Sequence, residues 1–258
     1  MIFAGIDIGS TTSKAVVIED GKKLIGHGYT PTGAESAKTA QKTLNIALLN
    51  AGVKQEDLSY IVATGYGRIL VPFADKNISE ISCHARGAHW YFPTVRTILD
   101  MGGQDCKAIK CTPDGNVGQF MMNDKCAGGT GRFLEIIADS LHLHLDKIGD
   151  IALQSDGKII FNTFCTVFAK SVALNMVKSG VQKMDILAGL NEALAKRCHH
   201  LLGRVGIEPD FAITGGISKN KDLVKRIEEK VGLKTLLAPD PQLIGAIGAA
   251  IFASTMRR

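Results

Sequence analysis

The sequence predicts an α/β protein built from two similar lobes. Strand-like runs alternate with helix-like runs along its 258 residues, and such alternation is typical of α/β folds. A repeat supports the second half of the prediction, because GIDIGSTTSKAVV at 5–17 aligns without a gap with ILDMGGQDCKAIK at 98–110. A chain of this length forms one large domain or two lobes of ordinary size. We interpret the repeat as a duplication; the alternative is a chance similarity between two β-hairpins.

The first third of the chain contains strands and helices in a clear order. Alternating apolar residues predict strands, and amphipathic spacing predicts helices. Three successive strands, a long helix, a fourth strand and a second helix are expected at 2–9, 13–19, 22–29, 34–51, 59–64 and 79–92. The pair Asp20-Gly21 lies between the second and third strands, and Asp-Gly is a typical hairpin turn.

The remainder of the chain repeats this organisation with longer helical segments. After the hairpin at 98–110, helices are expected from Thr130 or Gly131 and directly after Cys165, and a short strand at 211–214 precedes an apolar final helix. We therefore predict a first lobe of residues 1–96, joined by a C-terminal helix at 242–258 that packs back on it, and a second lobe of residues 97–241.

The two copies of the repeat have the composition of phosphate-binding turns. Small residues let backbone N–H groups and hydroxyls approach phosphate oxygens, and a carboxylate at a strand end can hold Mg²⁺, usually through waters. The candidate contacts in the first copy are Gly9, Ser10, Thr11, Thr12, Ser13 and Lys14, and those in the second are Gly102, Gly103, Gln104 and Asp105. Asp7 and Asp105 are the expected magnesium residues. The chain has no G-x-x-x-x-G-K-[ST] motif, so it is not a P-loop protein.

A third motif has the composition expected next to a nucleoside. DFAITGGISKN at 210–220 is a buried-type strand that ends in Gly215-Gly216 before a helix start. A glycine pair lets the backbone pass close to a ligand, and a helix N-terminus favours negative charge. Gln242, at the start of the last helix, completes the predicted nucleotide contacts.

These three motifs, in this order, resemble those of the actin, Hsp70 and sugar-kinase ATPase superfamily. GIDIGSTTSK is similar to its first phosphate motif, LDMGGQD to its second and ITGG to its adenosine motif. The resemblance covers nearly the whole chain. It implies two ribonuclease-H-like lobes that close over Mg·ATP.

Composition excludes several other classes of protein. The net charge is only +5 and no run of five basic residues occurs, so no nucleic-acid surface is expected. No apolar run reaches the ~20 residues that a membrane-spanning helix needs, and the N-terminus lacks the pattern of a signal peptide. We expect a cytoplasmic protein in which the six cysteines stay reduced. None of them forms a C-x-x-C pair, which disfavours a zinc or thioredoxin-type site.

Two of the cysteines, Cys126 and Cys165, precede predicted helices, in NDKCAGGTGRFLE and FNTFCTVFAKS. A helix N-terminus stabilises a thiolate. Three interpretations of the pair remain open on spacing alone: two buried small residues, a nucleophile for which no neighbouring base is evident, or two ligands of an iron–sulfur cluster. Such a cluster usually takes four thiolates, and a two-fold dimer would supply them.

The residues around both cysteines resemble the ATP-dependent activators of 2-hydroxyacyl-CoA dehydratases, which are related to the ATPase subunits of benzoyl-CoA reductases. ATGYGR, ADKNISEISCHA and DMGGQDCKAI are similar to the same family in the same order. The resemblance implies an oxygen-sensitive homodimeric ATPase with one [4Fe–4S] cluster between the subunits, held by Cys126 and Cys165 of each. It also implies a ferredoxin or flavodoxin as electron donor and an iron–sulfur dehydratase or reductase as partner.

The resemblance has one departure and leaves two alternatives. The family continues the second cysteine motif as CTVFAESE, whereas this chain has Lys170 and Val172 at the acidic positions, which leaves the partner open.

For hydrolysis we expect Gln104 or Asp105 to orient the attacking water, with Mg²⁺ and Lys14 offsetting charge. The alternatives are a sugar or acyl kinase of the same fold and a nucleotide-binding scaffold without turnover.

Overall fold

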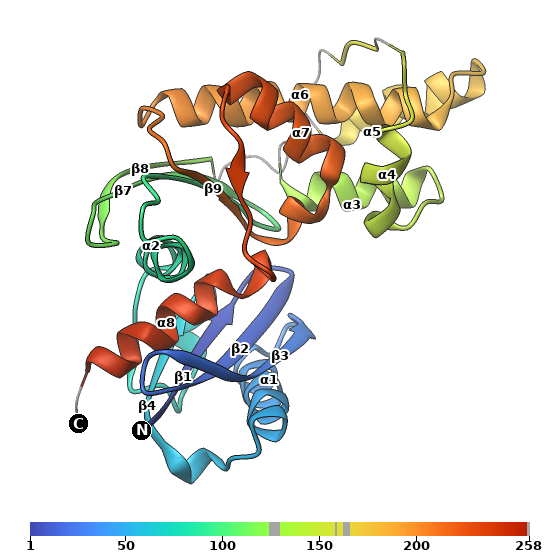
Figure 1. Ribbon diagram of the computed structural model, residues 1–258. Coiled ribbons are helices and arrows are strands. Elements are labelled where there is room, and N and C mark those ends of the chain that lie inside the picture. The colour runs from blue at the N-terminus through green and yellow to red at the C-terminus, as the bar shows by residue number, and fades with distance from the viewer. Residues whose placement is uncertain (124–129, 158, 162–165, 257–258) are drawn as a thin grey trace.

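The computed structural model describes residues 1–123, 130–157, 159–161 and 166–256 (Figure 1). Within these residues the chain forms two five-stranded sheets, one above the other in Figure 1, with helices between and around them. No helix in the described part of the chain is long and apolar enough to cross a bilayer.

The first sheet is formed by the N-terminal strands, in the order β3-β2-β1-β4-β5. Its strands are β1 (Ile2–Ile8), β2 (Thr12–Glu19), β3 (Lys23–Pro31), β4 (Leu58–Thr64) and β5 (Lys76–Asn77). Strand β1 pairs antiparallel with β2 and parallel with β4. The turn between β2 and β3 places Asp20 and Gly21 at φ 51° and 68°, as expected for a two-residue hairpin.

The second sheet has the order β10-β9-β6-β7-β8. Its strands are β6 (Thr97–Met101), β7 (Cys106–Cys111), β8 (Val117–Asn123), β9 (Phe211–Thr214) and β10 (Thr235–Leu236). Strand β6 pairs antiparallel with β7 and parallel with β9, so it takes the place that β1 has in the first sheet. When the second order is written in reverse, each strand matches its counterpart in the first, which supports duplication over chance similarity.

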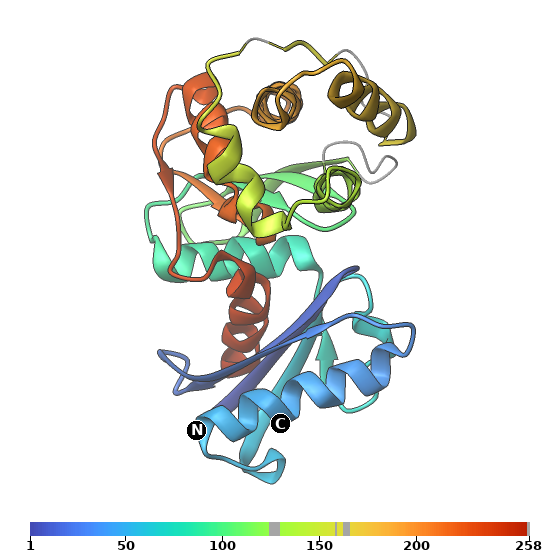
Figure 2. The same cartoon turned by 90° about the vertical axis from the view of Figure 1, so that its right-hand side faces the viewer.

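Helices pack on both sheets and between them (Figure 2). The α-helices are α1 (Ser36–Ala51), α2 (Glu80–Tyr91), α3 (Gly131–Ser140), α4 (Ile148–Ala152), α5 (Thr166–Lys178), α6 (Lys183–Gly203), α7 (Lys221–Val231) and α8 (Ile244–Thr255). The 3₁₀ turns are η1 (Gln55–Asp57), η2 (Arg68–Leu70), η3 (Leu145–Lys147), η4 (Gly216–Lys219) and η5 (Pro241–Leu243). Helix α1 packs on the first sheet, and α8 contacts strands β1, β2 and β4 of that sheet.

Helices α2 and α8 cross each other between the two sheets at very short distance. A Cβ atom on Gly248 would lie 1.8 Å from the carbonyl oxygen of Cys83, and one on Gly87 would lie 2.1 Å from that of Ile244. Only glycine permits this approach, since no real Cβ atom tolerates such distances. The small residues of α8 therefore serve the contact between the two halves of the molecule.

Most of the expected elements are present, with small shifts at their ends. Helix α3 begins at Gly131 with Thr130 as its N-cap residue, and α5 begins at Thr166. Strand β8, helix α4 and the two-residue strands β5 and β10 were not predicted. They are short or carry exposed residues along much of their length, so their hydrophobic pattern is weak.

Candidate nucleotide site

A cavity of about 600 Å³ lies where the ends of the two sheets face each other. The two hairpin turns, the start of α2 and the β9–η4 turn all contribute to its lining. Of the predicted site residues, the following line it: Asp7, Gly9, Ser10, Thr11, Thr12, Lys14, Gly102, Gly103, Gln104, Asp105, Gly215, Gly216 and Gln242. The fold thus brings together three motifs that lie far apart in the sequence.

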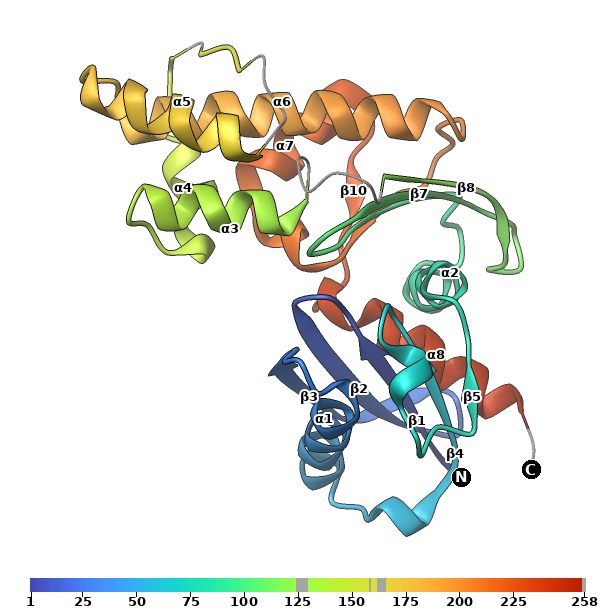
Figure 3. The same ribbon diagram turned by 180° about the vertical axis from the view of Figure 1, so that it is seen from behind.

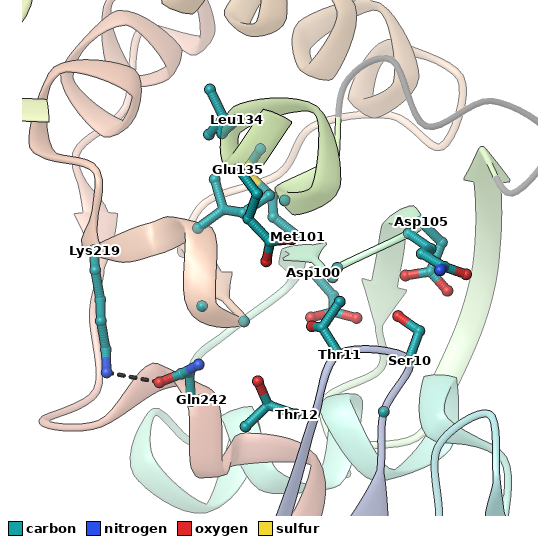
Figure 4. A pocket seen from close by; sticks show the side chains of 18 of the residues that line it. Ser10, Thr11, Thr12, Asp100, Met101, Asp105, Leu134, Glu135, Lys219 and Gln242 are labelled. Carbon is teal, nitrogen blue, oxygen red and sulfur yellow. Dashed lines mark hydrogen bonds between the residues drawn. The ribbon is translucent and has the colours of Figure 1, made fainter. Parts of the chain in front are cut away.

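The two hairpin turns meet across the cavity, where Figure 4 shows Ser10 and Thr11 facing Asp100 and Asp105. A Cβ atom on Gly103 would lie 2.5 Å from Thr11 Oγ1 and 3.0 Å from Ser10 Oγ. Hydroxyls from one lobe therefore lie against the backbone of the other, and a phosphate chain between the turns would contact both.

Each hairpin contains an aspartate and a lysine paired across its two strands. Asp7 is the register partner of Lys14, and Asp100 is that of Lys107. Lys14 Nζ lies 3.4 Å from Asp7 Oδ2, and Lys107 Nζ lies 3.3 Å from Asp100 Oδ2 and 2.6 Å from Asp105 Oδ1. The same aspartate–lysine pair therefore occurs at equivalent positions of the two hairpins, in agreement with the repeated strand order.

The second pair lies in a partly buried cluster of carboxylates. Lys107 is 2% exposed and its Nζ also lies 3.1 Å from Oε1 of Glu80. Burial alone would lower the pKa of Lys107, but Asp100, Glu80 and Asp105 outweigh it and raise the pKa. Burial would likewise raise the pKa of Asp100, but His84 and Lys107 hold it below its usual value. These opposite shifts of the two pKa values keep Lys107 and Asp100 charged at neutral pH.

The glycine pair of the third motif lies opposite the turns. Gly215 has φ +87°, and a Cβ atom there would lie 2.3 Å from the Met101 carbonyl oxygen, so only glycine fits. Gln242 Oε1 accepts a hydrogen bond of 2.7 Å from Lys219 Nζ, and Figure 4 shows this pair at the edge of the cavity. These side chains offer donors and acceptors to a nucleoside.

Ser13 is the predicted contact that the structure does not place at the cavity. Its side chain is completely buried, and its hydroxyl lies 2.8 Å from Thr32 Oγ1. The reason is the alternation of a strand: β2 begins at Thr12, so Ser13 points to the opposite face from its neighbour. We remove Ser13 from the set of phosphate contacts.

Charged and titratable residues that line the cavity but were not predicted from the sequence include Glu80, His84 and Lys107. Lys107 could have been found, because it aligns with Lys14 in the repeat. Glu80 and His84 lie four residues apart on α2 and so share one face of the helix. Both residues lie in ADKNISEISCHA, the segment that resembles the activator family, but only the fold shows that this face of α2 lies against the second hairpin.

Cys126 and Cys165 lie outside the described residues. The helices that follow them, α3 and α5, pack against each other, and Figure 3 shows their N-termini toward the same side. The other four cysteines are buried free thiols in α2, β7 and α6. Within the described ranges, no group of three or more His, Cys, Asp or Glu side chains is arranged to hold a metal ion.

The start of α3 is hydrogen-bonded to the second hairpin turn. The backbone N–H of Gly131 donates to the Gly102 carbonyl oxygen at 3.0 Å, and that of Arg132 donates to the Gly103 carbonyl oxygen at 2.7 Å. These donors belong to the first turn of the helix, where N–H groups lack helical partners. The turn that lines the cavity and the helix that follows Cys126 are therefore directly linked.

Comparisons with known proteins agree with this geometry. The chain is 44% identical over 253 residues to the activator of lactoyl-CoA dehydratase from Anaerotignum propionicum, with 98% of this chain and 97% of the relative covered. Component A of the (R)-2-hydroxyglutaryl-CoA dehydratase of Acidaminococcus fermentans superposes with a TM-score of 0.95 at 38% identity, covering 99% and 98% of the two chains.

The activator of the 2-hydroxyisocaproyl-CoA dehydratase from Clostridium difficile, solved with bound ADPNP, gives a TM-score of 0.94 at 36% identity, covering 99% of this chain and 95% of that one. Both solved structures share the mixed α/β fold with two sheets that is typical of actin-like ATPases. A family model matches residues 4–253. The chain therefore belongs to the BadF/BadG/BcrA/BcrD ATPase family.

Proposed function

We propose that this chain is an ATP-hydrolysing activator that delivers single low-potential electrons to an iron–sulfur partner enzyme, such as a 2-hydroxyacyl-CoA dehydratase. Its family is one of ATPases, and three relatives that it matches over nearly their whole length are named as activators of 2-hydroxyacyl-CoA dehydratases. ATP and ADP are the expected nucleotides, as a solved relative binds the analogue ADPNP.

The nucleotide would occupy the cavity with its phosphates between the two hairpin turns and its nucleoside near Gly215, Gly216 and Gln242. Asp7 and Asp105 line this cavity, and oxygen donors of this kind suit Mg²⁺ held through waters. The metal, when bound, would neutralise charge on the phosphates. Gln104, which also lines the cavity, is our candidate for a contact to the attacking water.

One observation carries the proposal: the hydrogen bonds from Gly131 and Arg132 to the Gly102–Gly103 turn. A displacement of this turn on nucleotide binding or hydrolysis would move the start of α3, because two backbone hydrogen bonds connect them. Helix α5 packs against α3 and follows the second cysteine. A change of the bound nucleotide would thus shift both segments that contain the predicted cluster ligands, as domain closure around a ligand does in other proteins.

The cluster belongs to the proposal in the form that the family resemblance implies. One [4Fe–4S] cluster would be held by Cys126 and Cys165 from each subunit of a homodimer, and it would store a single electron. The electron would come from a ferredoxin or flavodoxin in the cytoplasm. An uphill one-electron transfer costs about 1.4 kcal/mol for every ~59 mV, so a step of several hundred millivolts needs a source such as ATP hydrolysis.

The final substrate depends on the partner, and α5 is where this chain departs from the family pattern. Lys170 is exposed on that helix, whereas Val172 is partly buried against the core of the second lobe. Where the family has an acidic residue, this chain has Val172, so a negative charge is absent from this partly buried position. Lys170 changes the sign of a surface charge one turn after the helix start, which favours a partner surface of different charge and allows a low-potential reductase as partner.

Anaerobic purification tests the proposal directly. We expect a brown dimer with about four irons per two chains, ATP-dependent reduction of an iron–sulfur partner, and loss of iron in Cys126→Ala and Cys165→Ala. Cys111→Ala, which removes a buried thiol of β7, is the matched control and should keep its iron. A colourless protein that transfers phosphate to a sugar or acyl acceptor would overturn the proposal, and so would binding of ATP without turnover.

A further inference from the structure

A second cavity, of about 430 Å³, lies between the second sheet and α6, and nothing in the proposed function uses it. Helix α6 contacts β7 and β8 on this side, and Figure 1 shows it running across the two strands. The lining of this cavity, which we call the α6 groove, includes three cationic side chains, Lys196, Arg197 and Arg204. Among the residues that the structure describes, no Asp or Glu lines it.

Neighbouring carboxylates offset only part of the positive charge of the groove. Lys196 and Arg204 are exposed, and Lys196 Nζ lies 3.6 Å from Glu192 Oε1. The same carboxylate group pairs with Lys230 at 2.7 Å and with Arg226 at 3.4 Å. One negative charge shared by three cations leaves this end of α6 positively charged, although the net charge of the whole chain is only +5.

The groove adjoins the segment that contains the first predicted cluster cysteine. Arg197 Nη2 donates a hydrogen bond of 3.1 Å to Asn123 Oδ1, which connects α6 to the last residue of β8. Cys126 follows Asn123 by three residues, and three residues span at most about 11 Å. A protein bound at the groove would therefore lie close to a predicted cluster ligand. Electron transfer between two proteins requires such closeness of their redox centres.

We propose that the α6 groove is the docking surface for an acidic electron-donor protein, such as a ferredoxin or flavodoxin of net negative charge. The inference rests on the electron-transfer activity of the proposed function and specifies where the donor binds. In the docked complex one electron passes from the reduced centre of the donor to the oxidised cluster. The donor is oxidised by one electron, the cluster is reduced by one, and no bond forms or breaks.

The charge and position of the groove suit a donor better than the acceptor enzyme. Complementary charge accelerates the encounter of two proteins and fixes their orientation, and electron-transfer complexes are typically small and transient. The acceptor enzyme must respond to the nucleotide, and the proposed coupling acts through the starts of α3 and α5. The groove lies on α6 and β8 instead, so a donor can bind there while α3 and α5 face the acceptor.

Charge reversal at the exposed edge of the groove tests the inference. Lys196→Glu combined with Arg204→Glu takes the formal net charge from +5 to +1, since each replacement changes it by −2. Lys22→Glu combined with Lys42→Glu makes the same change at two exposed positions of the first lobe and is the matched control. Lys196→Gln combined with Arg204→Gln adds no negative charge beside Glu192, so it tests the groove even if the reversal variant does not fold.

The anaerobic assay uses the full chain with an acidic ferredoxin as the probe. Calorimetry with oxidised ferredoxin measures binding without electron transfer, and stopped-flow absorbance measures reduction of the cluster by reduced ferredoxin. At low ionic strength the groove reversal should raise Kd and lower the second-order rate constant, each about 10-fold or more. The neutral variant should show a smaller change in the same direction. Added salt should weaken wild-type binding and reduce these differences.

The control variant and dithionite distinguish docking from other effects. The first-lobe variant should bind ferredoxin like wild type, and dithionite, which needs no docking surface, should reduce the cluster equally in every variant. Equal losses in both reversal variants would overturn the inference, because net charge alone would explain them. Wild-type ferredoxin affinity in the groove variants would also overturn it, and so would loss of only the ATP-dependent reduction of the acceptor enzyme. A wild-type protein without a cluster would overturn the proposed function itself.

Discussion

At the scale of single residues, the two hairpins show the same chemistry in different surroundings. Lys14 pairs with Asp7 in the first hairpin, whereas the buried Lys107 of the second pairs with Asp100, Asp105 and Glu80; both groups line the cavity. A duplicated motif has thus acquired additional charged partners in its second copy. Removing its buried carboxylate, Asp100, breaks the charge pair with Lys107 in a site of low dielectric constant, which is costly.

Asp100→Asn should lower the free energy of unfolding at pH 7 by about 3–5 kcal/mol. The pKa of Asp100 is lowered from its ordinary 3.8 in the folded state, so its contribution is present above that value and is lost as pH falls through the lower folded pKa. Urea unfolding from pH 7 to pH 3 should therefore show wild type and variant converging. Asp114→Asn, at an exposed position, is the control; a gap that stays constant with pH would contradict the prediction.

The buried thiols should be unreactive in the native protein. Burial raises the pKa of Cys83 to about 12 and raises that of Cys111. The hydrogen bond with Cys198, followed by burial, raises the pKa of Cys106. Since the thiolate is the reactive form, iodoacetamide at pH 8 should label these three positions only after denaturation, as read by peptide mass spectrometry. Rapid native labelling of Cys83 would show that α2 separates from α8.

At the scale of elements, the turn between β6 and β7 has two neighbours. Thr11 of the first hairpin lies against Gly103, and α3 is hydrogen-bonded to the Gly102 and Gly103 carbonyl oxygens. A change in the distance between the two turns would therefore also displace the N-terminus of α3. This link is the reason that we place the coupling of nucleotide and electron transfer at this turn.

Gly103→Ala should weaken ATP binding about 10-fold to 100-fold. Its new methyl group would lie 2.5 Å from Thr11 Oγ1 and would force the hairpin turns apart. Calorimetry with ADP and a non-hydrolysable ATP analogue measures the effect. Gly118→Ala is the matched control, because a Cβ atom there has ordinary contacts of 3.5 Å or more. Unchanged affinity in Gly103→Ala would show that the turns do not approach each other when nucleotide is bound.

At the scale of the whole molecule, the two sheets are joined by helices that touch through glycine. Helix α8 packs on the first sheet and α2 contacts strands of the second, so their crossing connects the halves. Residues from both helices share the same buried clusters. The lobe boundaries at residues 96, 97, 241 and 242 remain a prediction.

Gly248→Ala should destabilise the protein by 1–3 kcal/mol or more, which is the range for overpacking. The methyl group would lie 1.8 Å from the Cys83 carbonyl oxygen, so α2 and α8 must separate. Gly203→Ala at the end of α6 is the control, as a Cβ atom there meets nothing within 4 Å; it should be neutral or stabilising by up to about 1 kcal/mol. Denaturant unfolding compares the two, and equal stability would contradict the prediction.

Much of the fold could be predicted because its signals are local. The Asp20-Gly21 turn, the strand alternation around it and the N-cap at Thr130 each follow from a few neighbouring residues. Strand β8 could not be predicted in this way, since it is an edge strand with exposed residues along its length. Residues 117–123 form a strand because they pair with β7, and their own hydrophobic pattern contributes less.

The sequence by itself determined the repeated hairpins, the order of the motifs and the residues that lie in each turn, because these are properties of short segments. Only the tertiary structure decided which side chains meet at the cavity. Ser13 turns away from it because strands alternate, and Glu80 and His84 enter it because α2 packs between the sheets. Contacts between distant segments depend on how whole elements pack, and no single segment encodes that packing.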